Sequence, residues 1–125
     1  MGPDGRHLPG AHLIDAYGGG GFRFADLSHR GSLLALPSGM WAWPFAHPAE
    51  LNEAAFQRVF DEADAIDTLL VGTGAQPAGL PPAVRAALRD RGIVVETMAT
   101  GAAARTWNIL TGEKRRVAAA LLAIA

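Results

Sequence analysis

The stretch Asp67-Thr68-Leu69-Leu70-Val71-Gly72-Thr73-Gly74 decides the fold of this chain. Its centre, Leu-Leu-Val, is a continuous apolar run, which is typical of a β-strand buried on both faces. A predicted helix begins at Pro81-Pro82, and Ile93-Val94-Val95 forms a second apolar run after it. A strand, a helix and a strand over about 30 residues predict a right-handed βαβ unit with two parallel strands.

The composition is that of a globular protein that folds without disulfide or thiolate–metal cross-links. The chain has 125 residues, no cysteine, a net charge of -1 and 18% charged residues. The absence of cysteine excludes disulfides and thiolate metal sites, and the balanced charge argues against nucleic-acid binding. We predict a single domain over residues 1–125, with a Gly/Pro-rich flexible tail at 1–10 and a folded region at 12–124. With no targeting signal and no apolar run long enough for a membrane span, we expect a cytoplasmic protein.

The region before residue 48 has the alternating pattern of β-structure. We predict strands at 13–17, 22–24 and 32–36, and a polar turn at 26–31. The four glycines at 18–21 are interpreted as a turn, because no Gly-Lys-Ser/Thr sequence follows them as a phosphate loop requires.

An aromatic segment, Met40-Trp41-Ala42-Trp43-Pro44-Phe45, follows these strands. In a strand, Trp41, Trp43 and Phe45 lie on one face. They either cover a face of the core or form a patch that binds a partner, and the pattern leaves both interpretations open.

The remaining chain predicts two further helices and an ambiguous end. Apolar residues at helical spacing favour a helix at 49–63, and a second helix at 100–111 has Thr100 as its predicted N-cap. Residues 117–125 are rich in alanine, which favours a helix, but an uninterrupted apolar run also suits a buried strand.

The order and spacing of short motifs along residues 12–124 resemble one small protein family. The chain is similar to a family of unknown function that contains the mitochondrial respiratory complex I assembly factor 3 together with uncharacterised bacterial and archaeal proteins. The motifs that carry the resemblance are Tyr17-Gly18, Gly21-Phe22-Arg23, Gly31-Ser32-Leu33-Leu34, Leu36-Pro37-Ser38-Gly39, Trp43, Leu70-Val71-Gly72-Thr73-Gly74, Val95-Glu96-Thr97-Met98, Arg105-Thr106 and Asn108-Ile109-Leu110.

The resemblance implies an α/β protein with a three-layer β/α fold. Its central sheet is expected to be mixed and five-stranded, with a small N-terminal β layer beside it. The last strand is expected inside the sheet and antiparallel to its neighbours, which favours a strand over a helix at 116–124. The resemblance also implies a non-catalytic interaction protein whose partners are subunits of a respiratory complex.

The sequence contains few patterns of residues that are typical of catalytic or metal sites. Its four histidines have no short paired spacing, so we predict no metal site and no cofactor. No Gly-x-Ser-x-Gly motif is present, and we favour a protein without enzymatic activity.

One crevice is a candidate for ligand binding, because open α/β sheets bind ligands beyond the carboxyl ends of their strands. Free N–H groups at 101–103 would favour an anion there. The same residues could instead form a tight turn and a helix cap. The candidate residues are Gly72, Thr73, Gly74, Thr100, Gly101, Ala102, Ala103, Arg105 and Asn108.

Two functions remain open at this stage. The first is an interaction protein that contacts its partner through Trp41, which departs from the family pattern, whereas Trp43 matches it. The second is a small-molecule or anion-binding protein, or an enzyme of unknown reaction, that uses the crevice between residues 72–74 and 100–108.

Overall fold

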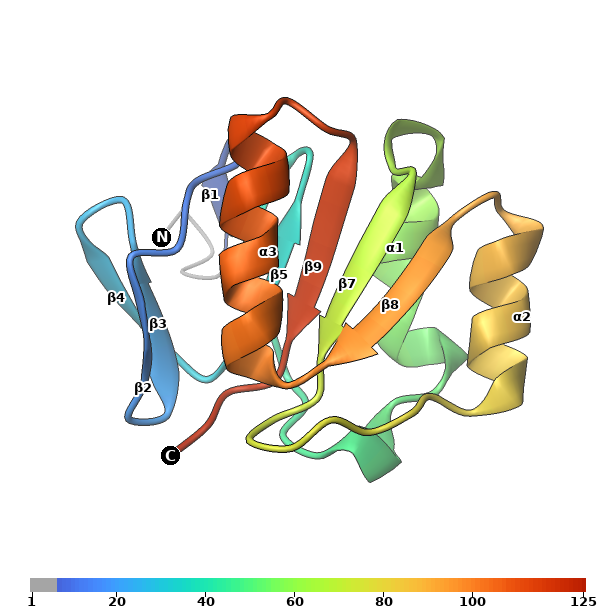
Figure 1. The fold of residues 1–125 in the computed structure, drawn as a ribbon, viewed down its shortest axis with the longest axis horizontal. Coiled ribbons are helices and arrows are strands. Elements are labelled where there is room, and N and C mark those ends of the chain that lie inside the picture. The colour runs from blue at the N-terminus through green and yellow to red at the C-terminus, as the bar shows by residue number, and fades with distance from the viewer. Residues whose placement is uncertain (1–6) are drawn as a thin grey trace.

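The computed structural model describes residues 7–125 and shows a six-stranded mixed sheet beside a smaller three-stranded sheet (Figure 1). The large sheet contains, in chain order, β1 (His7–Pro9), β5 (Ser32–Leu36), β6 (Gly39–Trp43), β7 (Thr68–Gly72), β8 (Val94–Met98) and β9 (Val117–Leu121). Its spatial order is β1-β6-β5-β9-β7-β8. The small sheet is antiparallel and contains β2 (Ala16–Gly18), β3 (Gly21–Phe24) and β4 (Leu27–Arg30).

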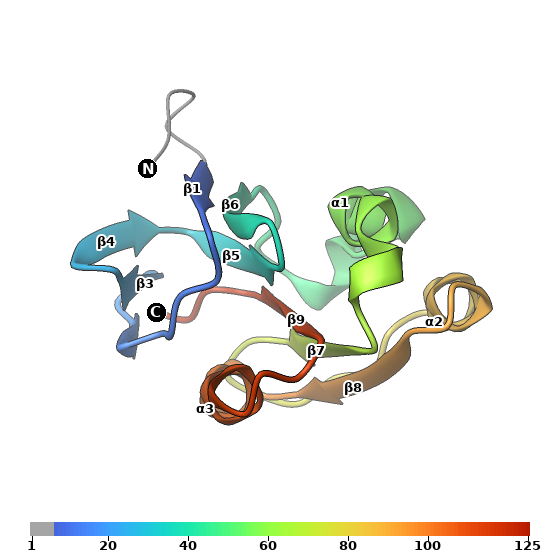
Figure 2. The same ribbon diagram turned by 90° about the horizontal axis from the view of Figure 1, so that it is seen from above.

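The predicted βαβ unit is confirmed. Strands β7 and β8 are parallel, with Leu70 beside Glu96, and helix α2 (Pro82–Asp90) connects them. Helix α3 (Thr100–Gly112) then leads back from β8 to β9 on the other side of β7. The two helices lie on opposite faces of the sheet, and both crossovers are right-handed (Figures 1 and 2).

Two apolar clusters, one on each face of the large sheet, make the three predicted layers. The first lies between the sheet and the helical layer of α1 (Gln57–Asp61) and α2, and the second lies between the sheet and the layer of α3 and the small sheet (Figure 2). Strand β9 supplies Ala118 and Ala120 to the first cluster and Ala119 and Leu121 to the second. This alternation explains why its sequence is uniformly apolar.

The last strand is confirmed as a strand inside the sheet, but its pairing differs in part from the expectation. β9 is antiparallel to β5 and parallel to β7, whereas we expected it to be antiparallel to its neighbours. The reason is the connection through α3. A helix that returns along the full length of the sheet brings the chain back to the end where β8 began, so the next strand runs parallel to β7 and β8.

The sheet has six strands and not the expected five, because β1 adds an edge strand within the predicted flexible tail. His7–Pro9 pairs antiparallel with β6, and the His7 ring stacks on Trp41 with 3.7 Å between the ring centroids. Pro9 is compatible with this position because an edge strand has a side without hydrogen-bond partners. Residues 1–6 of the predicted tail lie outside the described residues.

Strand β4 occupies most of the predicted polar turn at 26–31. The turn itself is shorter and lies at Ala25 and Asp26, both of which have positive φ, 49° and 60°. Two consecutive residues with positive φ form the tight turn that matches the twist of a two-stranded hairpin, which lets pairing resume at Leu27.

The predicted helix at 49–63 is broken into short pieces, which include α1. Two side chains start new turns within it. Glu50 accepts hydrogen bonds from the backbone N–H groups of Ala46 and His47, and Asn52 accepts one from Ala55. The 3₁₀ turns span Pro48–Glu50, Glu53–Phe56 and Ala63–Ala65. Local capping by side chains therefore outweighs the helical periodicity here.

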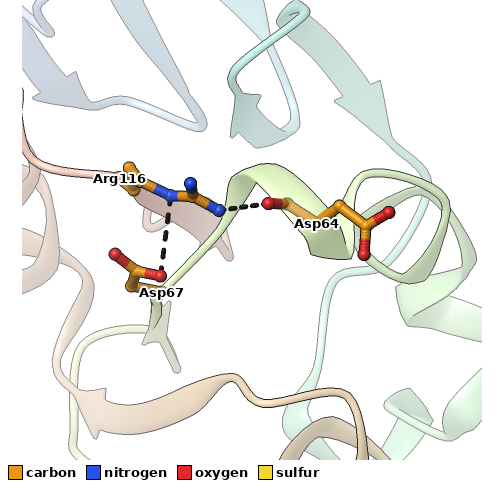
Figure 3. A network of polar contacts seen from close by, with 3 residues as sticks. All are labelled: Asp64, Asp67 and Arg116. Atoms are coloured by element: carbon orange, nitrogen blue, oxygen red, sulfur yellow. Dashed lines mark hydrogen bonds and ion pairs between the residues drawn. The ribbon is translucent and has the colours of Figure 1, made fainter.

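Arg116 ties the start of β9 to the segment that enters β7 (Figure 3). Its Nε lies 3.5 Å from Asp67 Oδ1, and its guanidinium also donates to the backbone carbonyl of Asp64. The backbone carbonyl of Arg116 accepts from the N–H of Asp67 at 2.8 Å. These contacts hold the two central parallel strands together at their beginnings.

Candidate functional site

The predicted crevice lies where β7 and β8 end and α3 begins. Gly72 ends β7 and Gly74 follows it with φ +104°, a conformation that favours glycine. The backbone of Gly74 meets Thr100 at the start of α3, because the N–H of Thr100 donates to the Gly74 carbonyl at 2.8 Å. The structure therefore brings the two halves of the predicted site into direct contact.

Thr100 joins three segments through its side chain. Its Oγ1 donates to the Leu122 carbonyl at 2.7 Å and accepts from the N–H of Gly74 at 2.9 Å. Thr100 is fully buried and is the first residue of α3, whereas the N-cap is Ala99. The prediction of Thr100 as N-cap is thus wrong. The Thr100 hydroxyl bonds to groups outside α3 and therefore does not cap the helix. Thr100 itself is already helical, so the N-cap is the preceding residue, Ala99.

Gly72 allows these segments to approach closely. A Cβ atom at this position would lie 2.8 Å from the Cα of Thr100, which is closer than real Cβ contacts. The Gly72 carbonyl also accepts from the N–H of Leu122 at 2.9 Å. Gly72 is therefore required for packing between β7, α3 and the end of β9.

Thr73 is buried in the same junction and organises the loop that follows β7. Its Oγ1 lies 2.9 Å from the Gln76 carbonyl and accepts from the N–H of Ala78 at 2.9 Å. Its backbone N–H donates to the carbonyl of Met98. The hydroxyl and amide of Thr73 are thus used within the chain.

The start of α3 is covered by Tyr17 from β2. A side chain at Gly101 would collide with the Tyr17 ring and hydroxyl, so the glycine makes room for the tyrosine. The N–H of Ala103 donates to Ala99 within the helix, and the Ala102 carbonyl accepts from Thr106. The expectation of free N–H groups at 101–103 is therefore wrong for Ala103, whose N–H is already bonded. This position also lies beside the Tyr17 phenol, which the sequence did not place there.

Arg105 and Asn108 project from α3 toward the segment that enters the small sheet. Arg105 donates to the hydroxyl of Tyr17 at 3.0 Å. Asn108 binds both backbone groups of Ile14, with its Oδ1 accepting from the N–H and its Nδ2 donating to the carbonyl, each at 2.8 Å. Together with Asp15 these side chains line an open pocket of about 360 Å³.

Trp41 is half-buried and lies beside the first apolar cluster. The His7 ring stacks on it, and the Arg58 guanidinium lies 3.8 Å from its ring centroid. Two groups this close cannot share one face of the ring, so both faces are covered. The indole Nε1 donates to Ser38 Oγ at 3.1 Å, and Trp43 is buried beneath with its Nε1 bonded to the Ala55 carbonyl. Trp41, Trp43 and Phe45 all pack on this cluster, as the interpretation as a core face predicted.

Comparison with known proteins places the chain in a family. Residues 14–122 match the family described as protein of unknown function DUF498/DUF598. The chain belongs to this family. It is 41% identical to an uncharacterised protein of Rhodobacter capsulatus, over 98% of this chain and 93% of that protein.

Members of the family include an assembly factor. The chain is 33% identical to mouse NADH dehydrogenase [ubiquinone] 1 alpha subcomplex assembly factor 3, over 92% of this chain and 62% of the mouse protein. The chain thus spans less than two thirds of that relative's length. The family resemblance predicted from the sequence motifs is confirmed.

Solved structures share the fold. A crystal structure described as an outer membrane protein from Bartonella henselae has a TM-score of 0.92 and 47% identity, over 95% of this chain and all of that chain. A Bordetella pertussis protein described as a Mth938-like domain has a TM-score of 0.79 and 30% identity, over 90% of this chain and 85% of that chain. The three-layer α/β fold is that of Mth938-like structures.

Within residues 7–125 there is neither a metal-binding cluster of side chains nor a membrane-spanning helix. No cluster of three or more histidine, aspartate or glutamate side chains in this part of the chain could hold a metal ion. No helix within it has the length and apolar character needed to cross a membrane.

Sequence reasoning missed the residues that cover the crevice. Tyr17 and Ile14 are far from α3 in the sequence, and the hydrogen bonds to Arg105 and Asn108 join residues 88 and 94 positions apart. No local pattern gives such a pairing. In the sequence, Tyr17-Gly18 stands out only as one of the motifs that carry the family resemblance.

Proposed function

We propose that this protein is a non-catalytic binding protein that supports assembly of a respiratory NADH dehydrogenase complex. The observation that carries the proposal is the alignment with NADH dehydrogenase assembly factor 3 of mouse over 92% of this chain. The proposed partners are subunits of that complex.

The geometry of the crevice supports a role without catalysis. Thr73 and Thr100 are buried there, and their hydroxyl groups bond to backbone groups of the same chain. A buried hydroxyl that already has its partners stabilises the fold and is a poor nucleophile or base.

The experiment is a deletion of the gene in its native organism. Assembled NADH:quinone oxidoreductase is measured by in-gel activity, with succinate dehydrogenase as the control enzyme. We expect the NADH-dependent enzyme to fall while the succinate-dependent enzyme stays near normal, and a plasmid copy to restore it. Unchanged amounts of the assembled enzyme in the deletion strain would contradict the proposal.

Trp41 is the proposed partner anchor, because interface hot spots are rich in tryptophan and this side chain lies at the surface. We expect Trp41→Ala to lower co-purification of NADH dehydrogenase subunits with the tagged protein. The loss of stability should be smaller than for a fully buried tryptophan, because Trp41 is half-buried and loses one aromatic stack, one cation–π contact, one hydrogen bond and part of its apolar packing. The matched control is Arg58→Ala, which uncovers the indole and keeps it.

Arg58→Ala should retain partner capture if the indole is the anchor. Trp43→Ala is the reference for a buried tryptophan and should cost about 3–5 kcal/mol. If Trp41→Ala costs as much as Trp43→Ala, or if capture is unchanged in Trp41→Ala, the assignment of Trp41 as anchor is wrong.

A second candidate function is anion or small-molecule binding at the crevice, and Arg105 favours it. Its guanidinium lines the open pocket beside Tyr17 and lies one turn from the N–H groups of residues 101–103. Chemical-shift changes at Gly101, Ala102 and Ala103 on addition of inorganic phosphate would support this function. If these chemical shifts do not change at high phosphate concentration, the anion-binding function is contradicted.

A further inference from the structure

The small sheet carries its polar side chains on one face. In an antiparallel pair, directly opposite residues point to the same side. Arg23 of β3 lies opposite Ser28 of β4, and Arg30 lies opposite Gly21. Phe22 and Phe24 alternate with these positions and are buried in the second apolar cluster. Arg23, Ser28 and Arg30 therefore share the outer face, away from the core.

Two glycines lie opposite each other on β2 and β3. Gly21 carries no side chain and lets β3 approach β4 closely, because a Cβ atom there would collide with the backbone carbonyl of His29, whereas a Cβ atom at Gly18 would meet no atom within 4 Å. Gly18 lies opposite Gly21 on β2, so the neighbouring strand adds no side chain either. The result is a pocket of about 330 Å³ with a glycine backbone at its base and Arg23, Ser28 and Arg30 at its sides.

The two charged side chains that line this pocket, Arg23 and Arg30, are both positive. No carboxylate lines it, and within residues 7–125 neither Arg23 nor Arg30 forms an ion pair. Both arginines are exposed and sit at diagonal positions across the strand pair, where their Cα atoms are about 7–8 Å apart. Two like charges on neighbouring positions of one sheet face repel each other, and no carboxylate side chain lines the pocket between them.

Most other arginines within residues 7–125 contact a carboxylate, an aromatic ring or an oxygen atom, and Arg89 is an exception that lines no glycine-rich hollow. Arg115 and Arg116 lie near carboxylates, and Arg58 lies over the Trp41 ring. Arg23 and Arg30 instead face a hollow that is large enough for a small ion. An oxyanion between them would accept hydrogen bonds from two guanidinium groups and remove their repulsion.

We propose that the outer face of the β2–β3–β4 sheet is a binding site for a phosphate-type oxyanion. Arg23 and Arg30 supply the charge and the forked N–H donors, and the Ser28 hydroxyl supplies a further donor. The glycines at 18 and 21 let the anion approach the sheet. This site is separate from the crevice at α3 and does not depend on the proposed role in assembly.

The test is a titration of the ¹⁵N-labelled full chain with inorganic phosphate, with sodium chloride at matched ionic strength as reference. We expect saturable shifts of the amides of Gly18, Gly21, Arg23, Ser28 and Arg30 with phosphate. In Arg23→Gln/Arg30→Gln the dissociation constant should rise at least about tenfold, which corresponds to the loss of two charge-assisted contacts.

A control double variant, Arg89→Gln/Arg115→Gln, removes the same charge from α2 and from the segment after α3. It should bind phosphate at the small sheet as the unmodified protein does. Equal shifts with chloride, or equal weakening in both double variants, would show general charge screening and overturn the proposal. Retained affinity in Arg23→Gln/Arg30→Gln would overturn it as well. A thermal melt of each variant without phosphate verifies folding.

Discussion

Polar side chains are buried and hydrogen-bonded at the junction at the start of α3, but they are exposed on the outer face of the small sheet. At the junction, the hydroxyl of Thr100 is fully buried and bonded to Leu122 and Gly74. On the small sheet, Arg23 and Arg30 are exposed and lie beside a hollow lined by no carboxylate. Both regions contain glycines. Gly72 brings backbones together at the junction, and Gly21 does the same between β3 and β4, whereas Gly18 leaves open space.

This difference separates stability from binding. A polar group that has its partners inside the chain contributes to the fold, and its removal leaves those partners unsatisfied. A charged group without a partner contributes little to the fold and is available for a ligand. We therefore expect variants at the junction to unfold more easily and variants on the outer face of the small sheet to alter binding.

The largest effect is expected for Thr100→Val. The substitution keeps the shape of the side chain but leaves the Leu122 carbonyl and the Gly74 N–H without their partner. The free energy of unfolding should fall by about 2–4 kcal/mol, measured by urea denaturation. The comparison between the two regions fails if Thr100→Val is as stable as the unmodified protein.

Thr111→Val is the matched control for this substitution. The Thr111 hydroxyl is also buried, but it has no hydrogen-bond partner among residues 7–125. Removing it should leave stability unchanged or raise it by about 1 kcal/mol, because a buried unpaired polar group is unfavourable. A large loss of stability in Thr111→Val would mean that the change of threonine to valine is harmful by itself.

An intermediate effect is expected for Asn108→Ala, because Asn108 links α3 to the segment that enters the small sheet. Asn108 holds both backbone groups of Ile14, the residue that leads into the small sheet. Its loss should lower the free energy of unfolding by about 1–3 kcal/mol and speed amide exchange at Ile14. Unchanged exchange at Ile14 would show that the segment is held by other contacts.

Arg105→Ala is the control on the same side of α3. Within residues 7–125 its guanidinium donates one hydrogen bond, to the Tyr17 hydroxyl at the surface. Loss of an exposed polar contact of this kind should cost about 0–1 kcal/mol. A loss of several kcal/mol would mean that Arg105 has a structural role, which would weaken its assignment to a ligand site.

A small stabilising effect on the small sheet is expected for Ala25→Gly. Ala25 has φ 49° in the β3–β4 turn, a conformation that is unfavourable for residues with a Cβ atom. Glycine should raise the free energy of unfolding by about 0.5–1 kcal/mol, seen as a higher melting temperature. The matched variant is Gly19→Ala in the β2–β3 turn.

Gly19 has φ 62°, and a Cβ atom added there meets no atom within 4 Å. Gly19→Ala should therefore destabilise the protein by about 1 kcal/mol through backbone strain alone. Ala25→Gly and Gly19→Ala should change stability in opposite directions. If they change it in the same direction, positive φ is not the cause of strain at these two turns.

The sequence alone determined those elements whose contacting residues lie close together along the chain. The apolar runs around Leu70 and Val95 and the helix between them were enough for a parallel βαβ unit, because the crossover length and handedness restrict the arrangement. The order of motifs was also enough for the family. The meeting of the end of β7 with the start of α3 followed in the same way, because a strand end and the start of the next helix lie at the same edge of the sheet.

Only the tertiary structure decided what the side chains in these regions do. The position of β9 between β5 and β7 brings Leu122 to Thr100, and the packing of β2 on α3 brings Tyr17 to Arg105. The pairing of β3 with β4 sets Arg23 and Arg30 on one face of a hollow. Such contacts join residues that are distant in the chain or depend on strand register. A one-residue slip of register would move every side chain to the opposite face, so no local pattern of residues can specify them.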